Sequence, residues 1–261
     1  MKFSCEKALL SEAINIASRA AAPKSTVPVV EGILLEAGAQ LRVTGFNLET
    51  GIRTVVDASV KEMGSIVLNP KLFGDIIRRL PDDVVSVESD KNDKVTIICG
   101  PVKYDIIATN SDEYPNLPEV DREEGISVAQ AKMKSMISQT LFAVSDNDIR
   151  PIHTGSLFDV EDNLLTMVSV DGYRLAVRKE EITENECGNI KFVVPGAALN
   201  EVEKICSDSD EEVFIKAGDK HIVFNMGDTM LVSRRLEGEF LNYKQAIPRN
   251  NAIKVNADRK T

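Results

Sequence analysis

The side chains that could perform chemistry are few and lie far apart along the chain. The only histidines are His153 and His221, and Asp171 stands before a glycine in the sequence VDGYR. A carboxylate and an imidazole can act together as general base and acid, so Asp171 and His153 would be the pair of an unrecognised hydrolase. An aspartate beside a glycine is also typical of a turn in which the carboxylate accepts hydrogen bonds from its own backbone. We favour the turn for Asp171 and the start of a strand for His153.

Signatures of the common catalytic and metal-binding families are missing from the sequence. It contains no GxGxxG, GxxxxGK[ST], GxSxG or HExxH pattern and no two cysteines at metal-ligand spacing. The acids Asp208, Asp210, Glu211 and Glu212 fall between an expected helix and an expected strand, where nothing fixes a coordination geometry. We therefore predict a non-catalytic binding protein with no cofactor and no metal site.

The elements that position these residues are organised as an internal repeat. VTGFNLETGIR at 43–53 aligns with VSVDGYRLAVR at 168–178, and GSIVLNPKLFGDIIRRL at 64–80 aligns with NIKFVVPGAALNEVEKI at 189–205. The order, the spacing and the apolar pattern agree between the copies. A unit of this length exceeds the roughly 20 to 50 residues of a solenoid repeat and is typical of a duplicated domain.

The repeat divides the chain of 261 residues into domains. We predict domain one at 1–120, domain two at 126–248 and the start of a truncated third copy at 252–261, where IKVNADRK is similar to the N-terminal MKFSCEK. Segment 111–125 is rich in acidic residues, proline and glycine and is predicted to link the domains. Hydrophobic residues make up 43% of the chain, which is enough for two cores.

Each copy is predicted to be an α+β domain with two helices packed on antiparallel sheets. In copy one, a helix is expected over about residues 5–22, and a second begins at Asn69 and Pro70 and ends at Pro81. Copy two repeats this order, with helices at about 129–143 and after Pro195. Apolar residues of the copy-one helices recur at helical spacing and are expected to face the core: Leu9, Leu10, Ala13, Ile14, Ala17, Ala20, Leu72, Phe73, Ile76, Ile77 and Leu80.

The cysteines and the absence of long apolar runs predict a cytoplasmic protein. Cys5, Cys99, Cys187 and Cys206 lie far apart, mostly in apolar patterns, and are expected to be reduced and mostly buried thiols. No apolar run reaches the roughly 18 residues of a membrane span, and the N-terminus lacks the layout of a signal peptide. We expect no membrane association.

Several stretches resemble one protein family in order and spacing. MKFSCEKALL at the N-terminus, LRVTGFNLETGI at 41–52, DEYPNLP at 112–118, NDIRPIHTGSLF at 147–158 and VDGYRLAV at 170–177 are similar to the bacterial sliding clamp, the beta subunit of DNA polymerase III. The resemblance covers the whole chain. It implies the DNA clamp fold, with three such domains per subunit and two subunits in a head-to-tail ring around double-stranded DNA. A duplicated protein-interaction module without DNA binding is the alternative.

The resemblance also implies a DNA-facing surface. A net charge of −10 is unfavourable for tight phosphate binding, but a sliding ring needs only a modestly positive inner wall. Family members often carry aromatic residues where this chain has Pro151 and Ile152, and basic residues where it has Gly196 and Ala197. By position, the DNA-binding residues would be Lys24, Lys71, Arg78, Lys134, Asn147, Arg150 and Ile152.

A second implied site is a groove for short linear peptides of the DNA polymerase III alpha subunit and the clamp loader. Its wall would be apolar, with an arginine as a directional donor and a glycine that lets the peptide backbone pass close. The copy-one equivalent, GFNLETGI, lacks the Tyr-Arg-Leu set, whereas a hairpin turn leading into a core strand would explain VDGYRLAV without a groove. The groove residues would be His153, Thr154, Val170, Gly172, Tyr173, Arg174, Leu175, Leu241, Gln245 and Ala246.

The resemblance finally predicts the assembly. The full-length form is expected to be a homodimer that closes by pairing a sheet edge of domain one with domain three of its partner. The domain-one edge is expected around residues 71–79 and 103–107. The present chain lacks a complete third copy and is expected to be monomeric.

Overall fold

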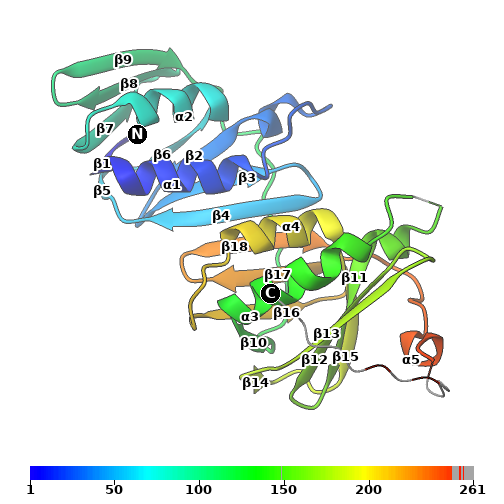
Figure 1. Ribbon diagram of the computed structural model, residues 1–261. Helices are drawn as coiled ribbons and strands as arrows, with labels where there is room; N and C mark the ends of the chain where they lie inside the picture. The colour runs from blue at the N-terminus through cyan, green and yellow to red at the C-terminus, as the bar shows by residue number, and fades with distance from the viewer. Residues whose placement is uncertain (148, 249–252, 254, 256–261) are drawn as a thin grey trace.

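A computed structural model describes residues 1–147, 149–248, 253 and 255 (Figure 1). The predicted third-domain start at 252–261 lies outside the described residues except for Ile253 and Val255, which are exposed.

The N-terminal half contains the strands and helices expected for the first copy. They are β1 (Lys2–Glu6), α1 (Lys7–Ser18), η1 (Pro28–Glu31), β2 (Ile33–Ala37), β3 (Leu41–Phe46), β4 (Thr50–Val56), β5 (Ser59–Glu62), β6 (Gly64–Leu68), α2 (Pro70–Arg79), β7 (Val84–Ser89), β8 (Lys94–Cys99) and β9 (Val102–Ile107). The predicted start of α2 is confirmed, because the Asn69 carboxamide oxygen accepts a hydrogen bond of 2.9 Å from the Leu72 amide. Helix α1 ends at Ser18, earlier than expected, because the Ala22 amide donates to the Val30 carbonyl and the chain turns away.

The C-terminal half repeats this order and adds a short final helix. Its elements are β10 (Ile126–Ala129), α3 (Gln130–Thr140), η2 (Leu141–Ala143), η3 (Pro151–Thr154), β11 (Gly155–Glu161), β12 (Leu164–Val170), β13 (Leu175–Glu181), β14 (Glu184–Asn185), β15 (Ile190–Pro195), α4 (Gly196–Ile205), β16 (Glu212–Ala217), β17 (His221–Met226), β18 (Thr229–Arg234) and α5 (Tyr243–Ala246).

Within the described ranges, the strands form three antiparallel sheets. Their orders are β5-β1-β7-β8-β9, β14-β10-β16-β17-β18-β4-β3-β2-β6 and β13-β12-β11-β15. The nine-stranded sheet crosses from one half of the chain to the other through the pairing of β18 with β4. At this junction the buried hydroxyls of Thr54 and Thr229 share a hydrogen bond of 2.9 Å. The two halves are therefore joined by backbone hydrogen bonds in addition to the connecting segment.

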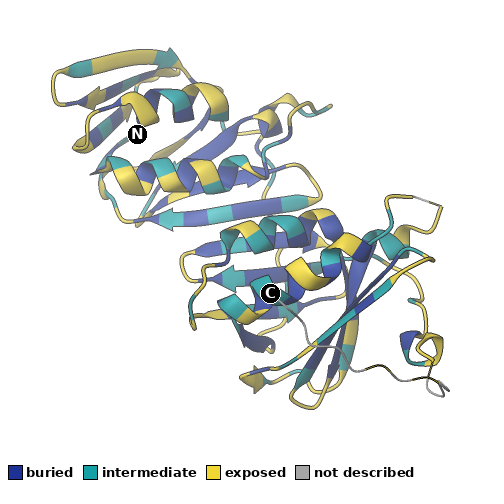
Figure 2. Cartoon of the chain, in the orientation of Figure 1, coloured by how far each residue is buried: buried dark blue, intermediate teal, exposed yellow. Residues whose placement is uncertain are grey.

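Helices α1 to α4 lie on one side of the nine-stranded sheet, in front of it in Figure 1. α1 packs against α2, and α3 against α4. An ion pair of 3.4 Å between Arg19, just after α1, and Glu201 on α4 connects the two pairs of helices. The helices thus form a layer that continues across the junction, with exposed residues on the viewer's side and buried strands behind (Figure 2).

Two residues expected in the core are exposed instead. Leu9 on α1 is 39% exposed and Leu72 on α2 is 49% exposed, whereas their neighbours Leu10 and Phe73 are fully buried. One residue corresponds to about 100° of rotation around a helix, so each leucine lies at the solvent side of the apolar face. The other predicted core residues of both helices are buried.

The connecting segment is packed against the sheet rather than free. Tyr114 and Leu117 are buried with Val223 and Val232, and the Tyr114 hydroxyl donates to the Thr44 carbonyl at 3.3 Å. Burial raises the pKa of Tyr114 above its usual value, so the phenol remains a donor. The segment therefore fixes the orientation of the two halves together with the continuous sheet.

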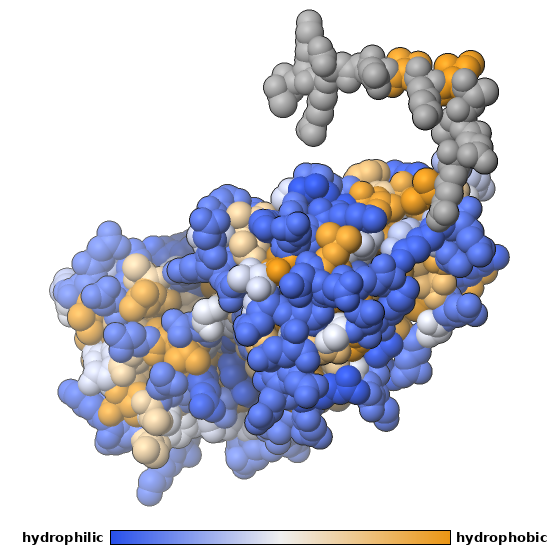
Figure 3. Space-filling model, turned by 90° about the horizontal axis from the view of Figure 1, so that it is seen from below, coloured by the Kyte–Doolittle hydropathy of each residue, from blue (hydrophilic) through white to orange (hydrophobic). Residues whose placement is uncertain are grey.

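All four cysteines lie in the described part of the chain and are free thiols, as predicted. Burial raises the pKa of Cys5 and of Cys206 to about 12, which makes these thiols unreactive at neutral pH. Among the described residues, no helix is long and apolar enough to cross a bilayer. The face seen in Figure 3 is largely hydrophilic, with apolar residues in small groups.

Candidate binding sites

The VDGYR turn is built around the Asp171 carboxylate. This turn connects β12 to β13, and its carboxylate accepts hydrogen bonds from the amides of Tyr173 and Arg174 at 2.9 and 3.0 Å. The Arg174 Nε donates to the second oxygen at 2.7 Å. These backbone hydrogen bonds, followed by the Arg174 contacts, lower the pKa of Asp171 to about 2. The predicted turn is confirmed, and the residue at its tip, Gly172, adopts a φ of 95° that favours glycine.

His153 contributes an aromatic surface rather than a base for catalysis. Its ring lies edge-to-face against Phe240, with centroids 5.5 Å apart. Partial burial, with a smaller contribution from Arg150, lowers the pKa of His153, so the imidazole is neutral at pH 7. Among the described residues, no hydrogen bond joins His153 to Asp171. The two residues therefore lack the contact that a hydrolytic pair uses.

The outer face of the four-stranded sheet carries an apolar cluster next to this turn. Leu157 pairs with Val168 and Val193, and Val168 pairs with Val177, so these side chains share one face. Residues 236–247, including α5, lie across that face. We call the resulting set the groove cluster; its members are Leu157, Val168, Val193 and Tyr243, which are buried, and Ile152, Leu175, Val177, Leu236 and Phe240, which are half-buried.

The structure brings only part of the predicted groove residues together. A cavity of about 380 Å³ is lined by His153, Gly172 and Tyr173. Another of about 390 Å³ is lined by Leu241 and the rest of the 238–244 segment. The remaining predicted residues differ in exposure: Val170 is buried, Thr154 and Leu175 are half-buried, and Arg174, Gln245 and Ala246 are exposed.

The predicted DNA-binding residues are spread over the helix layer and two loops. Lys24 is exposed in the loop after α1, and Asn147 and Arg150 are exposed in the loop before η3. Ile152 differs from them, because its side chain packs in the groove cluster. That contact favours a place in the groove wall over a role in DNA binding for Ile152.

Ion pairs reduce the free positive charge of the helix layer. Arg78 is paired with Asp75 on α2, and Lys134 on α3 is paired with Asp208 at 2.9 Å. Lys71 is exposed on the first turn of α2. Helices α1 to α4 contain seven basic and four acidic residues, whereas the chain as a whole has a net charge of −10. The four helices thus carry an excess of basic residues within an acidic protein.

Known families match almost the whole chain. The model for the N-terminal domain of the DNA polymerase III beta subunit matches residues 1–118, and the model for its central domain matches residues 127–242. The beta sliding clamp of Staphylococcus epidermidis is 33% identical over 264 residues, covering 98% of this chain and 70% of that protein. The chain belongs to the beta sliding clamp family.

Solved structures of clamps have the same fold. A putative DNA polymerase III beta subunit from Eubacterium rectale superposes with a TM-score of 0.90 at 39% identity, covering 94% of this chain and 67% of that one. The sliding clamp of Bacillus subtilis gives 0.91 at 29% identity, with 96% and 68% covered. The predicted α+β clamp fold is confirmed. Beta clamps are non-catalytic processivity factors, so membership of the family also confirms that this clamp chain is not an enzyme.

Three residues in or beneath the groove cluster are absent from the groove predicted from the sequence. Phe240 and Tyr243 bring aromatic rings to the groove cluster from the 236–247 segment. Asp159 lies under that segment and is 1% exposed. On a strand that alternates apolar and polar residues, an aspartate at this position is expected to face solvent. The contact with Tyr243, 84 positions away in the sequence, buries it instead.

Proposed function

We propose that the chain provides two domains, at 1–120 and 126–248, of a DNA replication sliding clamp. In the complete ring, duplex DNA would pass along the helix layer, and the replicative polymerase would be tethered through the groove cluster of domain two. The family models, which match 1–118 and 127–242, support this division. The positive balance of the helices supports the assignment of the DNA side.

The main support for a peptide groove at this place is the groove cluster itself. Leu175 opens β13 directly after the Tyr173 turn, and its side chain is half-buried in the groove cluster, to which Phe240 also belongs. A client peptide with glutamine followed by leucine and phenylalanine would place its apolar side chains against this cluster. Arg174, exposed at the edge, would donate to the peptide backbone.

Peptide binding tests this assignment. A fluorescein-labelled peptide of that sequence is expected to bind with an affinity near micromolar in the full-length clamp, which corresponds to about −8 kcal/mol. Leu175→Asp places a charge in the apolar wall and is expected to abolish binding. Leu72→Asp makes the same change at an exposed leucine of α2 and is expected to leave binding intact. Normal binding by folded Leu175→Asp would show that the groove lies elsewhere.

We also propose the partners and the assembly. The peptides would come from the DNA polymerase III alpha subunit and the clamp loader, and the full-length form would be a head-to-tail homodimer. Strand β9 supports the dimer, because in the described residues it pairs only with β8 and exposes Tyr104 and Ile107 at a sheet edge. The charged residues Lys103 and Asp105 on β9 disfavour pairing of this edge with itself, so the isolated chain is expected to be monomeric.

A further inference from the structure

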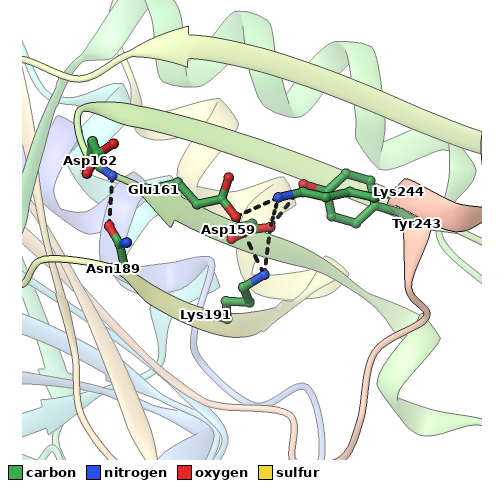
Figure 4. Close-up of polar contacts among 7 residues, drawn as sticks. All are labelled: Asp159, Glu161, Asp162, Asn189, Lys191, Tyr243 and Lys244. Atoms are coloured by element: carbon green, nitrogen blue, oxygen red, sulfur yellow. Dashed lines mark hydrogen bonds and ion pairs between the residues drawn. The ribbon is translucent and has the colours of Figure 1, made fainter.

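The short helix α5 is attached to the sheet by a buried hydrogen bond. The Tyr243 hydroxyl donates to Oδ2 of Asp159 on β11 at 2.9 Å. Both residues are shielded from water, with exposures of 5% for Tyr243 and 1% for Asp159. The Lys191 ammonium reaches the same oxygen at 3.0 Å, and Lys244 pairs with Glu161 at 2.5 Å (Figure 4).

The Asp159 carboxylate depends strongly on these partners. A buried charge is costly unless it is paired and hydrogen-bonded. Its second oxygen, Oδ1, is buried without a hydrogen-bond partner among the described residues. Among the described residues, the compensation for this carboxylate therefore falls on Oδ2, which accepts from Tyr243 and Lys191 and lies 3.9 Å from the Lys244 ammonium. Burial and the contact with Asp159 raise the pKa of Tyr243 to about 12, so its phenol is a stable donor at neutral pH.

Few backbone hydrogen bonds join the segment that carries α5 to the sheet. The Leu236 amide donates to the Val193 carbonyl at 3.1 Å. From residue 237 to residue 248, the backbone hydrogen bonds of the described chain stay within the segment itself, and none reaches the sheet. Side chains must therefore place this stretch. The Tyr243 ring lies on the apolar half of the sheet face. Its hydroxyl reaches the polar half, where Asp159 and Glu161 follow Leu157 on β11 and Lys191 precedes Val193 on β15.

We propose that Asp159 and Tyr243 are positioning residues of the peptide groove. Their hydrogen bond fixes α5 on the sheet, and α5 in turn fixes Leu241, Gln245 and Ala246 relative to Leu175. Neither side chain needs to touch the peptide. This inference rests on the proposed function of the groove, and it assigns the affinity of the groove partly to a contact beneath its wall.

The test combines peptide affinity with local protection of the segment, both measured in the full-length clamp. Tyr243→Phe removes only the hydroxyl and is expected to weaken binding of the labelled peptide about tenfold, which corresponds to about 1.4 kcal/mol. Asp159→Ala should weaken binding to a similar extent. Asp159→Asn keeps an acceptor for the phenol and should restore much of the affinity. The Asp159→Ala and Tyr243→Phe effects should not add, because they break one contact.

Limited chymotrypsin cleavage after Phe240 reports the position of the segment without any peptide. Cleavage should be faster in Tyr243→Phe than in the unmodified chain, because the segment opens locally more often. Tyr114→Phe is the matched control: it removes another buried tyrosine hydroxyl, which lies in an apolar cluster separate from the groove cluster, and should change neither peptide affinity nor cleavage at Phe240.

The outcomes distinguish the positioning role of the Asp159–Tyr243 hydrogen bond from the existence of the peptide groove. Unchanged affinity and unchanged cleavage in Tyr243→Phe would overturn the positioning role. Loss of affinity in Tyr114→Phe as well would assign the effect to general destabilisation and would also overturn it. If the unmodified chain binds no peptide, the proposed groove fails. Faster cleavage in Tyr243→Phe would then still show that the Asp159–Tyr243 hydrogen bond holds the segment on the sheet, and equal cleavage would refute this.

Discussion

Gly45→Ala is expected to destabilise the N-terminal half strongly, because β3 and α1 touch backbone to backbone at this position. A Cβ added to Gly45 would lie 1.9 Å from the Ala17 carbonyl oxygen and 2.9 Å from its carbonyl carbon. Both neighbours are main-chain atoms of a fully buried residue, so no side-chain rotation can relieve the clash. The helix would have to shift away from the sheet.

The size of the effect follows from two opposing terms. Overpacking a tight core costs about 3 kcal/mol or more when backbone must move. Alanine in a strand recovers about 1 kcal/mol relative to glycine. The free energy of unfolding of this half is therefore expected to fall by about 2 kcal/mol or more. Gly38→Ala is the control. A Cβ added there would have its nearest contact 3.9 Å away, at the Gln40 carbonyl oxygen, so the free energy of unfolding should change little.

The assay is urea unfolding followed by hydrogen exchange resolved along the chain. Exchange separates the two halves, which a single unfolding curve does not. Gly45→Ala should speed exchange in α1 and β3 at urea concentrations that leave Gly38→Ala protected. A Gly45→Ala chain as stable as Gly38→Ala would refute the close backbone packing of α1 on β3.

Four further outcomes are expected. In the full-length ring, Lys24→Ala or Arg150→Ala should reduce the slope of log affinity for duplex DNA against log salt by about 0.9 per contact; an unchanged slope removes the residue from the DNA surface. Sedimentation of the present chain should give a mass near 28.6 kDa, and a closed dimer retained on circular plasmid would contradict the head-to-tail assembly. The pKa of Asp171 is about 2 in the folded chain against 3.8 unfolded, so its carboxylate stabilises the fold above pH 3.8 and this contribution is lost as the pH falls from 3.8 to about 2. Asp171→Asn should flatten that part of the pH dependence of the free energy of unfolding. Ellman's reagent should modify half-exposed Cys187 first, and equal rates for all four thiols would contradict the burial of the other three.

The repeated order of helices and strands could be predicted because local patterns encode it. Asn69 and Pro70 predicted the start of α2, and the Asn69 side chain does cap that helix. The turn at Asp171 was predictable for the same reason, since an aspartate before glycine forms its hydrogen bonds within four residues. Leu9 and Leu72 were misplaced because apolar type alone does not separate the centre of a helix face from its margin.

Features that depend on distant segments could not be predicted from local patterns. The pairing of β18 with β4 joins strands from different copies of the repeat, and no turn residue or periodicity marks it. The burial of Asp159 depends likewise on Tyr243, which arrives from a segment without regular structure before α5. The predicted groove included exposed residues of the 236–247 segment, such as Leu241. It missed the buried hydrogen bond between Tyr243 and Asp159 beneath them.

The two faces of the four-stranded sheet would allow one domain to serve both proposed partners at once. Successive residues of a strand point to opposite faces, so Leu157 enters the groove cluster while Phe158 enters the core beneath α3 and α4. Helix α3 packs on the inner face of β12 and β13, and the 236–247 segment lies on the outer face. A peptide in the proposed groove therefore leaves the helix layer open to DNA. The same strands also connect the two surfaces, so a polymerase tethered on the outside would be kept close to the duplex inside.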